Sequence, residues 1–306
     1  MKYNRNQILL DADNIRNIKS VNGYEYLFAE LDDACIGGKG GNSSVFRLLS
    51  PDPDDSLEKE FVIKICNSPE GSKGRSGKRV ARFNREIKAL YDAKKRLNSP
   101  HVVDIEDDGV LKLNKKEFRC YIMPKADRDL GKWLAQETFT LTSRIELCEG
   151  ILDAVHALHS IDIYHRDLKP DNIFLYSNRW KIGDLGLISK RNEDNGLDKG
   201  ERKIGPWGFL SPEAINLYHS LDSSPRYPKI REIDNASDFF QLGLLFWFIL
   251  QGDVPAGNIT SKDLKLRNKK ISKIITESII RPMLQFNKKN RPSYKMLKSR
   301  FRKIDI

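Results

Sequence analysis

The sequence predicts an α+β protein of two lobes, a small lobe rich in β-strands followed by a larger, mainly helical lobe. Runs of β-branched and aromatic residues dominate around residues 24–65 and 102–123. Apolar residues recur at helical spacing from Leu141 to Leu158 and again beyond Asp238. A chain of 306 residues has a prior of one or two domains and can bury a large core. The strand-type runs, the helical spacing and the chain length all agree with the division into two lobes.

Three segments are expected along the chain. Residues 1–23, rich in Asn and charge, form an extension expected to pack on the small lobe as a helix or a strand. Residues 24–123 would form the small lobe, and residues 124–306 the hinge and the large lobe. Within the small lobe, Gly and Ser recur in residues 67–78, which predicts a solvated loop before a helix. Self-phosphorylation of its serines is the alternative interpretation of that loop.

Glycines are concentrated in residues 36–45, which read Ile-Gly-Gly-Lys-Gly-Gly-Asn-Ser-Ser-Val. A glycine-rich hairpin lets the backbone approach phosphate oxygens, where side chains would obstruct it. Glycine turns are common, so an ordinary turn explains this segment equally well on its own. The strand that follows, residues 61–65, carries one lysine in a β-branched run and adds weight to the phosphate interpretation.

That lysine is Lys64, and Glu86 lies on the predicted helix that follows, residues 82–90. A carboxylate on a neighbouring helix is a suitable partner for an ammonium that contacts phosphates. The alternative is a lysine that points to solvent. The sequence therefore offers a candidate Lys64–Glu86 pair in the small lobe.

Residues 165–172 read His-Arg-Asp-Leu-Lys-Pro-Asp-Asn, and we call them the catalytic loop. They combine a carboxylate, a cation and an amide within one short segment. Phosphoryl transfer needs a carboxylate to orient the hydroxyl, a positive charge for the migrating phosphoryl and an oxygen ligand for Mg²⁺. Asp167, Lys169 and Asn172 meet these needs. A polar loop that merely follows a helix is the alternative.

The catalytic loop resembles His-Arg-Asp-x-x-x-x-Asn of the eukaryotic-type Ser/Thr protein kinase family. Two later segments agree in order: Asp184-Leu185-Gly186 is similar to the family's Asp-Phe-Gly, and Ser211-Pro212-Glu213 to its Ala-Pro-Glu. The resemblance implies a bilobal protein-kinase-like fold. It also implies an ATP-dependent transferase that passes the γ-phosphoryl of Mg-ATP to Ser or Thr hydroxyls of a protein substrate.

Within the resemblance, Asp167 is the catalytic base, Lys169, Asn172, Lys64 and Glu86 complete the catalytic group, and Asn172 and Asp184 bind Mg²⁺. The residues implied to contact ATP are Gly38, Gly40, Val45, Val62, Lys64, Met123, Pro124, Ala126, Phe174 and Asp184. Ser43 replaces the third glycine of the family's loop. Pro124 has no N–H, so only its carbonyl could face adenine, and the next donor is the N–H of Ala126.

The resemblance also implies two structural roles. Glu213 and Arg291 would form a buried ion pair, and Asp238, at the start of a buried helix, would hold the backbone of the catalytic loop. Pro206 stands where Ser/Thr kinases of the family have Thr. The preference for Ser and Thr over Tyr therefore rests on Lys169.

Two other function classes share this fold. A small-molecule, antibiotic-type phosphotransferase usually has Gly in place of Arg166 and lacks the Ala-Pro-Glu segment, whereas this chain has both Arg166 and residues 211–213. A kinase-like scaffold without activity would be expected to have lost one of the four essential residues. All four are present: Lys64, Asp167, Asn172 and Asp184.

The segment between Asp184 and Glu213 corresponds to the loop through which many kinases are switched on by phosphorylation. Between Lys190 and Leu210 it contains no Ser, Thr or Tyr, although Ser189 lies just before. Its acidic residues could pair with the arginine of the catalytic loop, which predicts a kinase competent without loop phosphorylation. Those residues are Glu193, Asp194, Asp198 and Glu201. Solvation of the loop by these acids is the alternative.

Charge is distributed unevenly along the chain. Lys and Arg outnumber Asp and Glu by 53 to 42, and residues 260–306 alone hold 15 basic and 3 acidic residues. Such a patch could attract an acidic partner, nucleic acid or an acidic membrane surface. A solvated helical face is the alternative.

Four widely spaced cysteines form no Cys-x-x-Cys pair, so neither a zinc site nor a disulfide framework is expected. This usage favours a reducing, cytoplasmic location. No secretory signal is expected at the start of the chain. The longest apolar stretch, residues 239–250, is too short to span a bilayer, so no transmembrane segment is expected.

Overall fold

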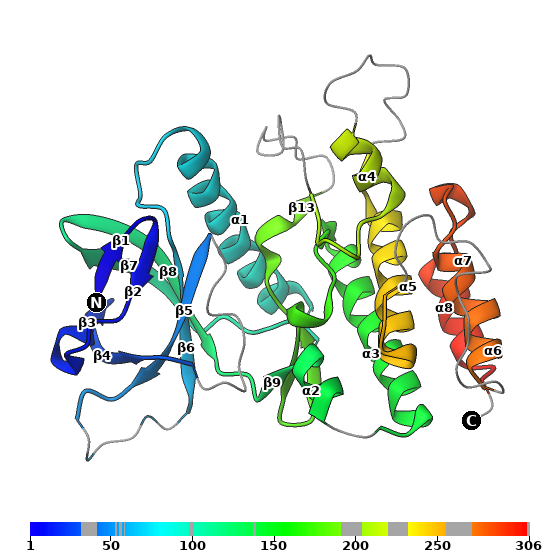
Figure 1. Ribbon diagram of the computed structural model, residues 1–306, viewed down its shortest axis with the longest axis horizontal. Coiled ribbons are helices and arrows are strands. Elements are labelled where there is room, and N and C mark those ends of the chain that lie inside the picture. Colours follow the sequence, from blue (N-terminus) through cyan, green and yellow to red (C-terminus); the bar gives the residue numbers. More distant parts are fainter. Residues whose placement is uncertain are drawn as a thin grey trace. The chain divides into compact units, whose positions relative to one another are not determined.

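The structure is a computed structural model that describes residues 1–31, 42–52, 54, 57, 59–97, 101–136, 139–190, 204–219, 232–254 and 271–304 (Figure 1). It divides into two compact units. Unit 1 comprises Met1–Asp129 and Phe174–Arg179, and unit 2 comprises Leu130–Ile173 and Trp180–Ile306. Residues 1–23 thus belong to unit 1, and the division falls after Asp129.

Unit 1 is built on a six-stranded sheet in which every neighbouring pair is antiparallel. Its strands, in spatial order, are β3 (Ile18–Val21), β4 (Tyr24–Ala29), β5 (Ser43–Leu49), β6 (Phe61–Cys66), β8 (Lys116–Pro124) and β7 (Asp107–Leu113). In β5, buried and half-buried side chains alternate, as a strand with one face on a core requires. In β6, all residues after Phe61 are buried, which agrees with its place inside the sheet.

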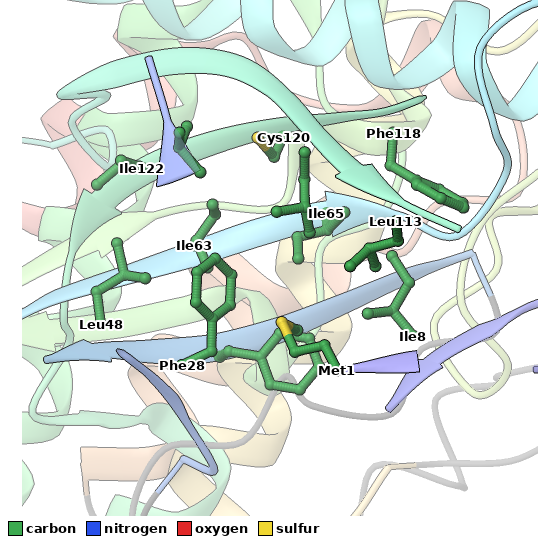
Figure 2. Packing of buried hydrophobic residues seen from close by; sticks show 13 residues of the cluster. Met1, Ile8, Phe28, Leu48, Ile63, Ile65, Leu113, Phe118, Cys120 and Ile122 are labelled. Carbon is green, nitrogen blue, oxygen red and sulfur yellow. The ribbon is translucent and has the colours of Figure 1, made fainter. Parts of the chain in front are cut away.

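The first residues form strands. Strand β1 (Lys2–Asn4) pairs with β2 (Gln7–Leu9), and the 3-10 helix η1 (Asn14–Asn17) leads into β3. Arg5 and Asn6 both have positive φ, as a tight two-residue hairpin turn requires. Met1 and Ile8 are buried in the apolar core of unit 1, near Phe28 and Phe118 (Figure 2). The expected extension is therefore an integral part of the first unit.

Helix α1 (Gly74–Leu97) packs against β6 and β8. Its buried residues Phe83, Glu86, Ile87 and Leu90 follow helical spacing and form one face. The helix begins inside residues 67–78, and Asn67 and Ser68 are buried. The predicted solvated loop is therefore wrong for both ends of that segment.

Unit 2 is mainly helical. Its helices are α2 (Leu130–Gln136), α3 (Leu141–Ser160), α4 (Pro212–His219), α5 (Asn235–Gln251), α6 (Ile271–Ile275), α7 (Arg281–Met283) and α8 (Tyr294–Phe301). A π-helical turn, η6 (Thr276–Ile280), joins α6 to α7, and η7 (Lys288–Asn290) precedes α8. The 3-10 helix η2 (Pro170–Asn172) lies within the catalytic loop, β10 (Ile163–Tyr164) precedes the loop in the sequence, and η3 (Leu185–Leu187) and β13 (Ser189–Lys190) follow it. Among the described residues, the remaining strands are β9 (Arg128–Asp129), β11 (Ile173–Tyr176) and β12 (Arg179–Ile182), and Arg128–Asp129 and Phe174–Arg179 belong to unit 1.

Helix α5 forms the centre of unit 2 and packs against α3 (Figure 1). Asp234 caps its first turn and exchanges hydrogen bonds with Ser237, and Gly252 ends it in the left-handed conformation. Nearly all its residues from Ser237 to Ile249 are buried, the polar Asp238 and Gln241 included. Polar groups buried this deeply need hydrogen-bond partners, and these two find them in the catalytic loop.

None of the helices in the described part of the chain combines the length and the apolar character needed to cross a membrane. Cys66, Cys120 and Cys148 are buried free thiols, and Cys35 lies outside the described residues.

Candidate active site

Asp238 anchors the start of the catalytic loop. Its Oδ2 accepts a hydrogen bond from the N–H of His165 and its Oδ1 from the N–H of Arg166, both at 2.8 Å. His159 Nε2 lies 2.8 Å from the same Oδ2. Burial alone would raise the pKa of Asp238, but the hydrogen bond from His159 and the backbone N–H of Arg166 outweigh it and lower that pKa. The expected role of Asp238 is confirmed, whereas the sequence did not indicate His159.

Gln241 holds the loop one helical turn further along α5. Its Oε1 accepts from the N–H of Leu168 at 3.0 Å, and its Nε2 donates to the carbonyl of Arg166 at 3.1 Å. Both polar ends of the amide are thereby used, which fixes its orientation. Gly205 is required nearby, because a Cβ there would come within 3.2 Å of the Arg166 carbonyl.

His165 links the catalytic loop to the Asp-Leu-Gly segment. Its Nδ1 accepts from the N–H of Asp167 at 3.2 Å, while its Nε2 lies 3.1 Å from the carbonyl of Gly183. Because Nδ1 accepts a hydrogen bond, Nε2 must carry the proton that it donates to the carbonyl. The ring is therefore held as the neutral Nε2–H tautomer. It ties the backbone next to Asp184 to the backbone of Asp167.

Asp167 is buried and held by its neighbours within the loop. Asn172 Nδ2 donates to Asp167 Oδ2 and to its carbonyl, both at 2.8 Å, and Lys169 Nζ lies 3.8 Å from Oδ2. Burial raises the pKa of Asp167, the charge of Lys169 opposes the shift, and the charge of Asp184 adds to it. The structure thus brings together three of the residues predicted from the sequence.

The residues predicted to hold a metal fit a divalent cation. The side-chain amide of Asn172 donates both of its N–H groups to Asp167, so its Oδ1 faces away from these bonds and can bind a cation. The negative charge of Asp184 contributes to the raised pKa of Asp167. Two ionised carboxylates this close repel each other unless a cation offsets the repulsion. Asp184 has a left-handed backbone, with φ 54°. Oxygen ligands of this kind suit Mg²⁺.

In unit 1, Lys64 Nζ lies 2.8 Å from Glu86 Oε1, and both side chains are buried. The pairing expected from the sequence is present, and a lysine that points to solvent is excluded. Tyr121 donates from its hydroxyl to the same Oε1 at 3.1 Å. The sequence did not indicate this third member, because its contact depends on how α1 packs on β8.

The residues predicted to contact adenine are found on adjoining strands of unit 1. Val45 lies opposite Lys64 in the sheet, and Val62 lies opposite Met123. The Pro124 carbonyl accepts a hydrogen bond from the hydroxyl of Tyr176 at 3.3 Å. A carbonyl oxygen has two lone pairs, so this bond leaves one for a further donor.

Phe174 lies opposite Asp129 in the β9–β11 pair, and Ala126 follows the end of β8. Gly38 and Gly40 lie outside the described residues, as do Glu193, Asp194, Asp198 and Glu201.

Glu213 and Arg291 form the predicted buried ion pair. Arg291 Nη2 lies 2.7 Å from Glu213 Oε1, and the arginine side chain is 0% exposed. The guanidinium also donates to the carbonyls of Gln285, Ala236 and Phe286. This pair joins the segment after the catalytic loop to the end of the helical unit.

Arg166 is buried and turned toward the start of the segment that follows Asp184. Its Nε donates to the Leu187 carbonyl at 2.7 Å and its Nη2 to the Ile188 carbonyl at 3.1 Å. Ser189 lies in β13, opposite Tyr164 of β10. The arginine therefore has backbone partners here, besides any acidic side chain further along.

The basic C-terminal region is partly neutralised within the described residues. Lys298 lies 2.6 Å from Glu149 and 2.7 Å from Asp153, and Lys288 lies 2.6 Å from Asp234. Arg281 pairs with Glu277 at 3.0 Å. These pairs agree with the alternative of a solvated helical face. Residues 260–270 lie outside the described residues.

A β-sheet unit with a buried lysine–glutamate pair and a helical unit that supports an Asp-Asn-Asp cluster define a protein kinase fold. The Protein kinase domain family matches residues 35–301, and the chain belongs to that family. The family implies use of ATP and a divalent metal.

Curated relatives carry kinase names. The chain is 25% identical to Dual specificity protein kinase TTK of Mus musculus over 259 residues, which are 83% of this chain and 27% of that protein. It is 27% identical to Probable serine/threonine-protein kinase mps1 of Dictyostelium discoideum, over 80% of this chain and 23% of that one. It is 28% identical to Serine/threonine-protein kinase pkn3 of Myxococcus xanthus, over 71% and 37%. The chain spans well under half the length of these relatives.

Proposed function

We propose that this chain transfers the γ-phosphoryl of Mg-ATP to Ser or Thr hydroxyls of protein substrates. The observation that carries the proposal is the Asp167–Asn172–Lys169 arrangement, in which a buried carboxylate is held 2.8 Å from an amide and 3.8 Å from an ammonium. A scaffold without activity would not need to preserve this geometry together with the Lys64–Glu86 pair. The kinase names of the relatives support the same conclusion.

In this proposal Asp167 accepts a hydrogen bond from the substrate hydroxyl and orients its oxygen toward the phosphoryl group. Its raised pKa suits a residue that takes up the hydroxyl proton as the new oxygen–phosphorus bond forms and the bond between the γ-phosphorus and the bridging oxygen of ADP breaks. Lys169 balances negative charge on the phosphoryl oxygens. Magnesium, when held by Asp184 and Asn172, would neutralise charge on the phosphates.

The decisive experiment is incubation of the chain with labelled ATP and Mg²⁺, followed by mass spectrometry of the chain and of a host lysate. Asp167→Asn should lower transfer by about 100-fold or more while ATP binding is retained, because only the orienting group is removed. Asp171→Asn is the matched control, since Asp171 is an exposed carboxylate of the same loop. Near-normal transfer by Asp167→Asn would contradict the mechanism.

Specificity for the hydroxyl is open to a direct test because Pro206 removes the threonine that many Ser/Thr kinases have there. Phospho-amino-acid analysis of the products should give phosphoserine and phosphothreonine. Phosphotyrosine in comparable amount would make the chain a dual-specificity enzyme, as the name of the mouse relative describes that protein.

Two finer proposals accompany the activity. The buried free thiols of Cys66, Cys120 and Cys148 fit a reducing compartment, which we take to be the cytoplasm. Binding of an acidic partner or of nucleic acid by residues 260–306 rests on composition alone, and filter binding of DNA and RNA at low salt tests it. Absence of retention would exclude the nucleic acids.

A further inference from the structure

We propose that Tyr121 is a positioning residue of the active site, which holds the Glu86 carboxylate in place for Lys64. This inference rests on the proposed function. Its hydroxyl donates to Glu86 Oε1 at 3.1 Å, and Lys64 Nζ lies 2.8 Å from the same oxygen. One carboxylate oxygen is thereby shared by an ammonium and a phenol.

The sheet places the two donors together. Lys64 of β6 and Tyr121 of β8 are direct partners in the antiparallel register. Directly opposed residues project from the same face of a sheet, so both side chains point to the face covered by α1. The Lys64 ammonium also lies 5.9 Å from the centre of the Tyr121 ring.

Helix α1 supplies the other half of the contact. Phe83 and Glu86 are three residues apart and lie on one face of the helix. The Phe83 ring packs on the Tyr121 ring with centroids 5.5 Å apart, while Glu86 meets the hydroxyl. Tyr121 therefore contacts the helix at two points, one apolar and one polar.

Burial makes the hydrogen bond a positional constraint. Tyr121 is 2% exposed and Glu86 is 1% exposed, so water cannot replace either partner. A buried phenol needs an acceptor, and a buried carboxylate needs donors. Because Tyr121 fixes Glu86 independently of Lys64, the carboxylate keeps its place when the ammonium turns to phosphate oxygens.

Tyr121→Phe removes only the hydroxyl and keeps the ring that packs on Phe83. Its affinity for Mg-ATP, measured by calorimetry, should fall about 10-fold, as expected for loss of a hydrogen bond to a charged group. The KM for ATP should rise with it, while the KM for the protein substrate stays unchanged. Tyr91→Phe is the matched control, because Tyr91 lies on α1 and its hydroxyl bonds the carboxylate of Asp108, 3.0 Å away.

A double-variant cycle separates positioning from general stability. In a Glu86→Ala background, the Tyr121→Phe change should alter ATP affinity less than about twofold, because its acceptor is gone. Glu86→Leu, which also lacks an acceptor, serves as a second background if Glu86→Ala does not fold. The inference would be overturned if Tyr121→Phe lost equal ATP affinity in the wild-type and Glu86-variant backgrounds, or if it lost none in the wild-type background. A wild-type protein that binds ATP yet phosphorylates no protein would instead refute the proposed function and leave the cycle interpretable.

Discussion

His159 and Asp238 are 79 residues apart in the sequence, and His159 Nε2 lies 2.8 Å from Asp238 Oδ2 in the structure. The bond runs from α3 to α5 and ends on the carboxylate that also receives two N–H groups of the catalytic loop. Histidine is the donor, because the carboxylate has a lowered pKa and stays ionised.

Replacing this histidine should destabilise the protein at neutral pH and much less at acidic pH. His159→Leu is expected to lower the free energy of unfolding by about 2 kcal/mol at neutral pH. A carboxyl with a lowered folded-state pKa stabilises the fold above its unfolded pKa of about 4, and this stability is lost as pH falls through the folded value. The gap between wild type and variant should therefore close at low pH. Urea unfolding over a series of pH values measures it.

His156→Leu is the control, because this variant loses the stacking contact between His156 and Tyr294 but keeps the bond between His159 and Asp238. A constant gap between His159→Leu and wild type across the pH series would show that Asp238 does not carry the effect.

Asp167→Asn should be more stable than the wild type at neutral pH, by about 1 kcal/mol, the usual gain when a strained active-site group is relieved. Burial raises the pKa of Asp167, so the folded protein favours the protonated form. The stability that the Asp167 carboxyl contributes is fully present below its unfolded pKa of about 4. This contribution is lost as pH rises through the higher folded value. The melting temperature of Asp167→Asn should therefore exceed that of the wild type at neutral pH, and the difference should shrink at acidic pH. A variant less stable at neutral pH would contradict this expectation.

Breaking the Glu213–Arg291 pair should unfold much of the helical unit. Arg291→Met leaves a buried carboxylate without its cation and is expected to cost about 3–5 kcal/mol. The double variant with Glu213→Leu should recover part of the loss, since no charge then remains buried. Arg281→Met is the comparison, because its partner Glu277 is half-exposed and the change should cost less than about 1 kcal/mol. Equal losses in the two arginine variants would refute the assignment.

The protein should remain active without phosphorylation of the segment after Asp184. Residues 191–209 contain no Ser, Thr or Tyr, and Arg166 already donates to two backbone carbonyls. Freshly prepared protein treated with a phosphatase is expected to keep most of its initial rate on a supplied substrate. A long lag that pre-incubation with ATP abolishes, traced by mass spectrometry to Ser189, would show the opposite.

The sequence predicted those parts of the site that short motifs encode. Asp167 and Asn172 are five residues apart in one loop, and their contact follows from local geometry. Lys64 with Glu86, and Glu213 with Arg291, were identified because each lies in a recognisable segment. His159, Gln241 and Tyr121 carry no such local signal, since each acts on a segment at least 35 residues away. The two-lobe division was predicted from alternating and helical periodicities, but the strands of residues 1–23 are too short to show either.

The burial of Asp238 and Gln241 within α5 ties the exchange of loop amides with solvent to the opening of the core. The N–H groups of His165, Arg166 and Leu168 donate to these two side chains. None of these hydrogens can exchange for deuterium unless its bond to the central helix breaks. Surface loops usually exchange through small local fluctuations, whereas this one should exchange only together with the most protected amides of α5. The backbone of the catalytic loop should thus be among the last parts of the protein to open to solvent.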